Sequence, residues 1–404
     1  MKSNVTDQQI DQIIADELDD LIDIRHTLHQ NPQIAFEETF ASAKVREQLD
    51  SLDIPHEHGI AKTGVVGWLA ADNADVSAEA VGLRADMDAL PITEATDLPY
   101  TSQIDGQMHA CGHDGHTTVL LGAARVLSKL RNHLPRPVKF VFQPAEEWGG
   151  GGNIMVQAGA LEKSVGNVKV SKMFGLHGWP QLNVGTVGLK PGPILASTDV
   201  FNMTVTGDGG HGGMPHTTVD PIIAAAHIIT AVQSIVSRNI DPTDPAVVSI
   251  GTIHAGQQFN IVPDAAKLTG TTRALNETTR TKIRDRFDQI AQQTAAGLGC
   301  TAAIEWDIGY PTTVNDPAFT GNVRDLVSQS IGEPNIVDLK APSMGAEDFS
   351  YYGRAVPSCF VLLGLKPKDQ ESYPSVHTPR FDFNDDALAT GIRMMCRIAL
   401  DADS

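Results

Sequence analysis

The sequence predicts an α/β fold in which one discontinuous domain carries a smaller α+β domain as an insertion. Three observations support this prediction. Strand-like and helix-like segments alternate early in the chain, the order of segments changes near Ala196, and the alternation resumes towards the C-terminus. A chain of 404 residues is also too long for one ordinary hydrophobic core and fits two domains.

The first part of the chain has the pattern of a sheet covered by helices. Residues 1–50 are expected to be helical, because Leu18, Leu21, Ile22 and Leu28 fall near helical spacing. Alternating strands and helices predict a largely parallel sheet. The expected strands are Gly64–Ala70, Ala80–Leu83, Val138–Phe142 and Lys172–Leu176, and the clearest expected helix is His116–Leu130.

Residues 196–308 show a different order, β-α-β-β-α-β, which is the ferredoxin-like arrangement. The expected elements are Asp199–Thr206 (strand), Asp220–Arg238 (helix), Ala246–Ala255 and Ala266–Ala274 (strands), Glu277–Leu298 (helix) and Thr301–Ile308 (strand). The first domain is therefore expected to comprise residues 1–195 and 309–404. In its second segment, Phe360–Gly364 is expected to be a buried strand and Asp385–Leu400 a closing helix.

Composition and charge narrow the class of protein. Hydrophobic residues make up 41% and charged residues 20%, as in folded globular proteins. A net charge of −19 repels phosphate backbones and anionic membranes, so no nucleic-acid or membrane partner is expected. The acidic N-terminus lacks the features of a secretory signal, and no apolar run approaches the roughly 20 residues of a membrane span. We expect a cytoplasmic protein whose cysteines, apart from Cys111, are buried thiols.

Five motifs rich in metal-ligating residue types lie at or near the ends of strand-like runs. Active sites of open α/β sheets lie beyond the carboxyl ends of the strands, so these loops are expected to converge. Imidazole, thiolate and carboxylate groups are the usual ligands of zinc and related divalent ions. The motifs are RADMDALP (Arg84–Pro91), MHACGHDGH (Met108–His116), QPAEE (Gln143–Glu147), GLHG (Gly175–Gly178) and SVHTPR (Ser375–Arg380).

Two of these motifs have a chemical and a plain structural interpretation. Cys111 and His113 are two residues apart and can face one site from a loop, or can be a buried thiol beside a helix-start histidine. Pro144 should end its strand and leave Glu146 and Glu147 beyond it. One of these carboxylates can bind a metal while the other takes a proton from water, although a solvated acidic turn would have the same sequence.

His177 and His377 complete the set. Taken alone, each histidine is more often a hydrogen-bonded structural residue than a ligand. The five motifs together favour a metal centre, because ligands arising by chance would not all fall at strand ends. A cysteine hydrolase with Cys111 as nucleophile and His113 or His116 as base is an alternative. It leaves the glutamate pair and the two distant histidines unexplained.

In this order the motifs resemble those of the M20 metallopeptidase family, and more narrowly its amidohydrolase branch. That branch includes hippurate hydrolases, auxin-conjugate hydrolases and N-acetyl-amino-acid deacetylases. The resemblance extends from Arg25-His26 to about Arg380. It implies a catalytic domain with two divalent metal ions (zinc, manganese, cobalt or nickel) and an inserted lid or dimerisation domain. It further implies a homodimer that hydrolyses the amide of small N-acyl amino acids.

The same resemblance implies roles for individual residues of the first domain. Glu146 corresponds to the general base, and Asp88 to the acidic residue that orients a metal-binding histidine. Asp86 stands where other branches of the family have a histidine ligand, so we expect that it is not a ligand. The implied metal ligands are Cys111, His113, Glu147, His177 and His377.

In the inserted domain, GDGGHGGMPH matches the family's glycine-rich segment. The match implies that His211 polarises the scissile carbonyl, from its own subunit or from a partner. Asn260 and Arg273 match lid positions that hold the substrate carboxylate. Two residues depart from many relatives: Asp208 replaces a lysine, and Trp148 replaces a glycine and is expected to shape the pocket.

Three alternatives to an N-acyl-amino-acid hydrolase remain open. They are an M20 dipeptidase or carboxypeptidase, the Cys111-dependent hydrolase, and an inactive member of the fold that serves as a metal-bound scaffold. The preferred acyl group and amino acid also remain open, because pocket shape decides them and motifs do not report it.

Overall fold

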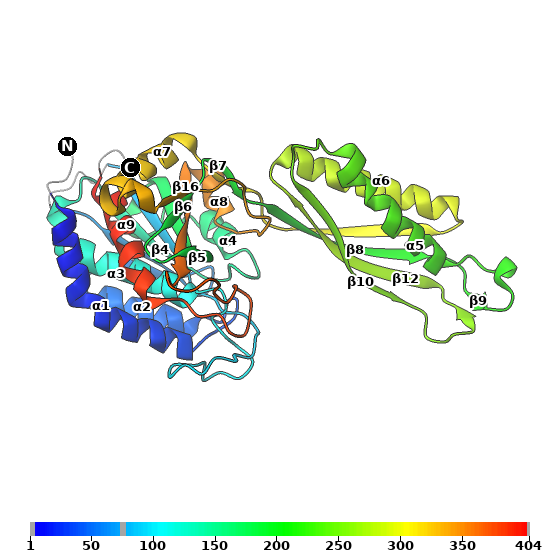
Figure 1. The fold of residues 1–404 in the computed structure, drawn as a ribbon, viewed down its shortest axis with the longest axis horizontal. Helices are drawn as coiled ribbons and strands as arrows, with labels where there is room; N and C mark the ends of the chain where they lie inside the picture. Colours follow the sequence, from blue (N-terminus) through cyan, green and yellow to red (C-terminus); the bar gives the residue numbers. More distant parts are fainter. Residues whose placement is uncertain (1–4, 73–77, 402–404) are drawn as a thin grey trace. The chain divides into compact units, whose positions relative to one another are not determined.

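A computed structural model of the chain describes residues 5–72 and 78–401, which fold into two compact units (Figure 1). Unit 1 comprises Met1–Ile194, Val314–Ala341 and Asp348–Ser404, and unit 2 comprises Leu195–Thr313 and Pro342–Glu347. Unit 1 is therefore discontinuous in sequence. The short segment Pro342–Glu347 belongs to unit 2, although the sequence analysis places it in the second segment of the first domain.

Unit 1 is built on an eight-stranded sheet with the strand order β1-β2-β4-β3-β5-β16-β6-β15. Its four central strands, from β4 to β16, run parallel, whereas β2 and β6 are antiparallel to their central neighbours. The prediction of a largely parallel sheet is therefore correct for its centre. The strands are β1 (His56–Ile60), β2 (Gly64–Leu69), β3 (Ala80–Asp86), β4 (Val138–Gln143), β5 (Val170–Asn183), β6 (Val187–Leu189), β15 (Ile336–Asp338) and β16 (Ser358–Lys366).

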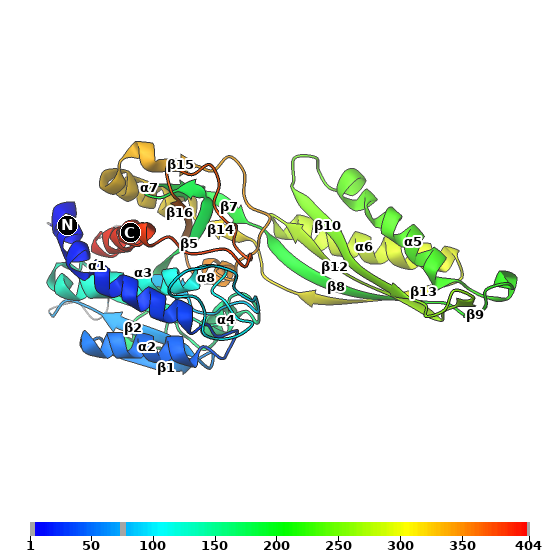
Figure 2. The ribbon, with the colours of Figure 1, turned by 60° about the horizontal axis from the view of Figure 1, so that its bottom comes forward.

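Helices cover both faces of this sheet, which is why every residue of β3 and β4 is buried (Figure 2). On one face α3 packs against α1 and α9, and their apolar side chains join the core of the unit. The helices of unit 1 are α1 (Asp7–Gln30), α2 (Thr39–Ser51), α3 (His113–Lys129), α4 (Gly151–Gln157), α7 (Pro317–Ile331), α8 (Ser350–Ala355) and α9 (Leu388–Leu400). Two short strands at the boundary of the units, β7 (Gly192–Leu195) and β14 (Thr313–Asn315), pair with each other.

Several boundaries differ from the sequence-based expectation. In unit 2, the helix expected over Asp220–Arg238 ends as α5 at Val232, and in unit 1 β3 continues to Asp86 and α9 begins at Leu388. The helical region expected over 1–50 is two helices, α1 and α2, separated by a segment with Pro32 and the left-handed Phe36 (φ 64°). α3 begins at His113 instead of His116, directly after the left-handed Gly112 (φ 85°). β5 continues to Asn183 because its second half pairs with β16, so His177 lies within a strand.

Unit 2 has the predicted ferredoxin-like topology. Its four strands are all antiparallel, in the order β10-β12-β8-β13, and its two helices pack on the sheet around a core that includes Phe201, Ile228 and Phe287. The elements are β8 (Ser197–Thr206), α5 (Pro221–Val232), β10 (Ala246–Ala255), β12 (Ala265–Ala274), α6 (Glu277–Gly297) and β13 (Thr301–Ile308), with the small pair β9 (Gly210–His211) and β11 (Ile261–Val262).

Among the described residues, one helical stretch is long and apolar enough to cross a membrane when length and composition alone are considered. It is Pro221–Asn239, which begins with α5, and a third of it is buried within the protein. Its buried residues Ala224, Ala225, Ile228 and Val232 pack into the core of unit 2. Packing on the sheet therefore accounts for one apolar face of this stretch.

Candidate metal centre

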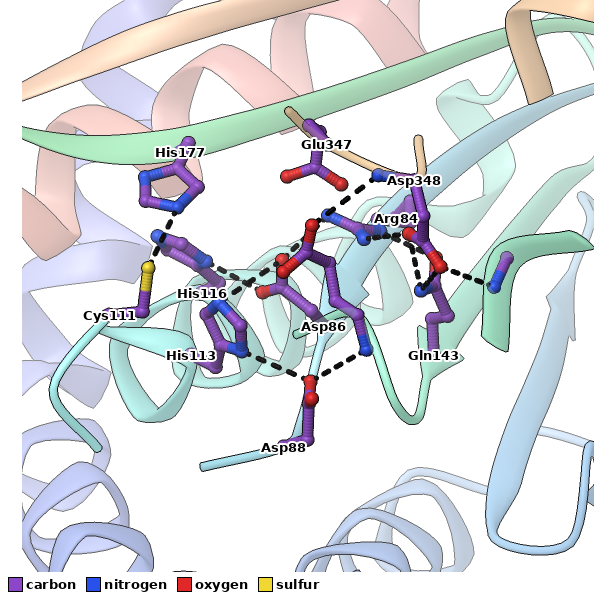
Figure 3. A network of polar contacts seen from close by, with 12 residues as sticks. Arg84, Asp86, Asp88, Cys111, His113, His116, Gln143, His177, Glu347 and Asp348 are labelled. Atoms are coloured by element: carbon purple, nitrogen blue, oxygen red, sulfur yellow. Dashed lines mark hydrogen bonds and ion pairs between the residues drawn. The ribbon is translucent and has the colours of Figure 1, made fainter. Parts of the chain in front are cut away.

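The candidate ligands of unit 1 come together at one edge of the central sheet. Figure 3 shows three of them, Cys111, His113 and His177, with the carboxylates of Asp86 and Asp88. Asp86 ends β3, the glutamates follow β4, and His177 lies in β5, three parallel strands that are neighbours in the sheet. The carboxyl ends of parallel neighbours meet at the same edge. Cys111 and His113 join them from the start of α3, and His377 from the C-terminal segment.

Two overlapping groups of side chains have the composition of metal sites. Cys111, His113 and His177 form one group, and Cys111, Glu147 and His377 form the other, each with ligand atoms within 4.8 Å of one another. Sγ of Cys111 lies 3.3 Å from Nε2 of His177. Nε2 of His377 lies 3.1 Å from Oε1 of Glu147. The structure thus brings together all five residues that the resemblance singles out as ligands.

Asp88 joins three parts of this centre. Its Oδ1 accepts hydrogen bonds from Nδ1 of His113 (3.2 Å) and from the amide of Glu146 (3.0 Å), and its Oδ2 accepts from the amide of Glu147 (2.9 Å). Since Nδ1 of His113 donates to Asp88, Nε2 of the ring is the nitrogen left for a ligand. This is the arrangement in which a carboxylate fixes the tautomer of a metal-binding histidine.

A tight turn after β4 presents the two glutamates. Ala145 has a left-handed backbone (φ 55°), and its carbonyl accepts the amide of Gly151 at 3.0 Å. Position 151 requires glycine, because a Cβ there would lie 1.8 Å from the carbonyl oxygen of Pro144. Glu146 is buried, and its Oε1 accepts the amide of Asp348 at 3.3 Å. The two adjacent carboxylates therefore have different surroundings.

The carboxylates of the centre make its electrostatics favourable for a cation. Burial opposes the charged form of His113, but Asp86 and Asp88 more than offset it and raise the pKa of His113 to about 10. Burial, and then Glu147 and Glu146, raise the pKa of the Cys111 thiol well above its ordinary value. Burial lowers the pKa of His177 to about 3, so its ring is neutral. A bound cation would reverse the effect on the thiol, since coordination favours the thiolate.

One buried atom supports the fit of a metal ion directly. Nε2 of His113 is buried and has no hydrogen-bond partner within residues 5–72 and 78–401. Buried polar atoms are nearly always satisfied, so an unpaired one among a thiol and carboxylates points to a missing ligand. The donor set of sulfur, nitrogen and oxygen atoms suits a divalent transition metal.

The geometry gives little support to a cysteine nucleophile. The imidazole hydrogen-bonded to Cys111 is His177, not His113 or His116. A nucleophilic cysteine needs a lowered pKa, whereas burial and the two glutamates raise that of Cys111.

Sequence reasoning assigned no role in the metal centre to two buried groups beside it. His116 contacts Asp86 and the backbone of Gly178, and burial lowers its pKa although Asp86 opposes this. Asp348 accepts hydrogen bonds from Arg84 (3.1 Å), from Gln143 (2.7 Å) and from a backbone amide of α4. His116 lies in the motif MHACGHDGH, in which Cys111 and His113 were the expected ligands. Asp348 follows no strand-like run, so nothing in the sequence marked it.

The three candidate residues of unit 2 do not lie together. His211 pairs with Ile261 across β9 and β11, and the carbonyl of Asn260 accepts the amide of Gly212 at 2.8 Å, so His211 and Asn260 share one end of the unit. Arg273 is eight residues beyond the first residue of β12, which is about 27 Å at about 3.4 Å per residue. There its guanidinium donates to the Oγ1 atoms of Thr198 and Thr271.

A sheet-edge cluster of thiol, imidazole and carboxylate groups that fits divalent cations, with a second buried carboxylate beside it, defines a metal-dependent hydrolase. The chain belongs to Peptidase family M20/M25/M40, whose sequence pattern matches residues 82–401. It is 37% identical to the IAA-amino acid hydrolase ILR1-like 4 of Arabidopsis thaliana, over 95% of this chain and 86% of that protein. It is also 37% identical to the N-acetylcysteine deacetylase of Bacillus subtilis, over 94% and 96%.

A solved structure agrees with this relationship. The crystal structure of the YXEP protein of Bacillus subtilis, described as a dinuclear metal binding peptidase, matches with a TM-score of 0.80 and 33% identity, over 96% of this chain and 98% of that one. The protein is thus a hydrolytic enzyme that acts on amides. Together, the family and the side-chain groups around Cys111 support two divalent metal ions.

Proposed function

We propose that the protein hydrolyses the amide bond of small N-acyl amino acids, with Glu146 as general base. The observation that carries the proposal is the pair of ligand groups sharing Cys111, with Glu146 buried beside them. Two relatives are named IAA-amino acid hydrolase and N-acetylcysteine deacetylase, and these names support this substrate class. Zinc, manganese, cobalt and nickel all suit such a mixed ligand set.

The proposed ligands are Cys111, His113, Glu147, His177 and His377. Divalent ions held by these residues would lower the pKa of a bound water and would polarise the carbonyl of the amide as Lewis acids. Asp88 holds Nδ1 of His113 and both glutamate amides, and so fixes the orientation of one ligand and the path of the chain at another. Asp86 is held by Arg84 and His116 (2.7 and 2.6 Å), which supports the expectation that it is not a ligand.

Glu146 is placed to move the proton. Its carboxylate is buried next to Glu147, and Glu146, Glu147 and His113 have ligand atoms within 4.8 Å of one another. In the proposed reaction Glu146 takes a proton from the attacking water. It then returns this proton to the nitrogen of the leaving amine.

The roles proposed for unit 2 imply a dimer. His211 would donate a hydrogen bond to the amide oxygen as it gains charge, Asn260 would contact the substrate beside it, and Arg273 would bind the free carboxylate with its planar fork. Within one unit 2, the strand distance of about 27 Å between the two ends far exceeds a small N-acyl amino acid. One site would therefore take His211 and Asn260 from one subunit and Arg273 from another.

Exposed surface on unit 2 supports such a homodimer. Ile222 and Ile223 of α5 are 40% and 51% exposed, and β10 and β13 are the edge strands of the sheet. Apolar side chains and open strand edges are typical of surfaces that pair with another chain. The acidic composition is in keeping with a cytoplasmic enzyme without nucleic-acid or membrane partners.

The proposal is tested by metal removal followed by a substrate panel. Dialysis against a chelator should abolish hydrolysis, and zinc, manganese, cobalt or nickel should restore it. The panel comprises hippurate, N-acetyl amino acids and dipeptides, scored by the free amino acid released. Activity that survives complete metal removal would refute the metal centre and favour the Cys111 alternative. A fully metal-loaded protein inactive on every amide would favour a scaffold, and preference for dipeptides would favour a peptidase.

A further inference from the structure

A fourth imidazole, that of His116, lies in the candidate metal centre beside the five proposed ligands. His116 is fully buried in the first turn of α3 and faces Asp86 (Figure 3). Asp86, His113 and His116 have ligand atoms within 4.8 Å of one another, so by proximity alone His116 is also a candidate ligand. The hydrogen bonds of the His116 ring show whether it is free to bind a metal ion.

Both ring nitrogens of His116 are already engaged by the protein. The amide of Gly178 donates to Nε2 at 2.8 Å, so Nε2 carries no proton and its lone pair is occupied. Nδ1 therefore carries the proton and donates it to Oδ1 of Asp86 at 2.6 Å. Oδ2 of Asp86 accepts from Arg84 at 2.7 Å, which fixes this carboxylate in turn.

Gly178, whose amide donates to His116, directly follows the proposed ligand His177. The carbonyl of Gly178 accepts the Nδ1 proton of His177 at 2.8 Å, which leaves Nε2 of His177 directed at Cys111. Gly178 is also closely packed, because a Cβ there would lie 2.8 Å from the side chain of Leu365. A series of hydrogen bonds thus runs from Arg84 through Asp86 and His116 to Gly178, and from there to the ring of His177.

We propose that His116 is a positioning residue and not a ligand: as a neutral ring it fixes the peptide of Gly178 and so holds the imidazole of His177 ready for metal. This inference rests on the proposed metal centre. It adds that His177 binds metal, whereas His116 only orients the ring of His177. Groups that orient a ligand in this way commonly change metal affinity by about 10–100-fold when they are removed.

Two substitutions separate the role of Nε2 from that of Nδ1. In His116→Gln the carboxamide reaches the place of Nε2 and can still accept the amide of Gly178. In His116→Asn it reaches only the place of Nδ1 and can contact Asp86 alone. His133→Asn, at an exposed histidine, controls for loss of a surface imidazole. For each protein, Co²⁺ affinity and stoichiometry are measured by titration, the thiolate-to-cobalt absorption reports Cys111, and circular dichroism reports folding.

Positioning predicts that His116→Gln and His133→Asn bind Co²⁺ like the wild type. It predicts that folded His116→Asn binds one equivalent about 10–100-fold more weakly, with altered thiolate-to-cobalt absorption. If both His116 variants lose one equivalent, His116 is itself a ligand and the inference is wrong. If His116→Asn binds both ions like the wild type, the bond to Gly178 is irrelevant and the inference is also wrong. Failure of the wild type to bind Co²⁺ would instead refute the proposed metal centre.

A measurement on the wild-type protein covers the case in which His116→Asn does not fold. In ¹⁵N spectra of the histidine side chains, the resonances of His116 are assigned by their loss in His116→Gln. If His116 is a positioning residue, its ring should be neutral and protonated on Nδ1 both without metal and with zinc. The ¹⁵N resonance of Nε2 of His177 should shift when zinc is added. A shift of Nε2 of His116 into the metal-bound range would overturn the inference.

Discussion

Glu146 and Glu147 are neighbours in sequence, yet the structure gives them different partners. Glu147 groups with Cys111 and His377, whereas Glu146 is buried and accepts the amide of Asp348. Both amides donate to Asp88, which fixes the backbone of the turn from which the two side chains extend. This difference is what allows one carboxylate to bind metal while the other moves a proton.

Substitution of each glutamate should therefore have a different effect. Glu146→Gln keeps the shape of the side chain but cannot take a proton, so turnover should fall at least about 100-fold while metal content and folding stay unchanged. Glu147→Gln should instead lower the metal content itself. Elemental analysis and initial rates on the best substrate of the panel measure both effects. Wild-type turnover in Glu146→Gln would remove Glu146 as the base.

Lys139 gives a pH-dependent prediction away from the metal centre. It is fully buried in β4, and its ammonium donates to the carbonyl of Ala160 (3.3 Å) and to Oγ of Ser164 (3.0 Å). Burial lowers its pKa to about 8, against the opposing effect of Glu57, whereas the ordinary value is 10.5. Between these two pH values the unfolded chain binds more protons at this position than the folded chain. The contribution of Lys139 to stability therefore rises with pH in that window.

Urea unfolding of the wild type and Lys139→Met across pH 7 to 10 tests this sign. Relative to the variant, the wild type should gain free energy of unfolding from about pH 8 upward and show no relative change below it. Other titrating groups are common to both proteins and cancel in the difference. A constant difference across the range would show that the pKa of Lys139 is not lowered by folding.

At the scale of elements, a buried guanidinium joins α1 to the start of α3. Nη1 of Arg25 donates to Asp114 and to Asp382, both at 3.1 Å, and its Nε contacts Asp385. Asp114 follows the proposed ligand His113 and is fully buried, so it has little access to water as a substitute partner. α1 therefore stabilises the start of the helix that carries His113.

Arg25→Met should destabilise unit 1 by up to about 3–5 kcal/mol, because it removes the buried guanidinium that Asp114, Asp382 and Asp385 share. His29 still contacts Asp114 at 2.8 Å in the variant and offsets part of this loss. Arg324→Met, which removes a partly exposed ion pair with Asp338, should change stability little. Chemical denaturation compares the two variants with the wild type. Equal effects of the two substitutions would mean that Arg25 does not stabilise the start of α3.

The elements also show which parts of the fold the sequence predicts. Strands with strong periodicity, such as β4 and the four main strands of unit 2, begin and end within a residue or two of their predicted bounds. The early start of α3 was missed, because it depends on the left-handed Gly112, which a helical pattern does not reveal. Asp348 was missed since it is 264 residues from its partner Arg84, and only the folded chain brings them together.

At the scale of the whole molecule, the chain passes between the two units four times, and the last passage lies between Glu347 and Asp348. The first residue after it, Asp348, contacts Glu146 and Gln143 of unit 1. The segment that ends unit 2 thus leads directly into the hydrogen bonds around the proposed base. On the proposed function, unit 2 also supplies His211 and Arg273, which one subunit cannot bring to the same small substrate.

Sharing of a site between subunits predicts complementation between two inactive variants. His211→Ala lacks the proposed carbonyl donor, and Glu146→Gln lacks the proposed base. If His211 acts on the site of the partner subunit, a heterodimer contains one site with neither defect and one with both. Unfolding and refolding an equal mixture should then restore about a quarter of wild-type activity, because about half the dimers are mixed and half their sites are intact. If His211 serves its own subunit, every site keeps one defect and the mixture stays as inactive as its components, which would exclude a His211 supplied by the partner subunit.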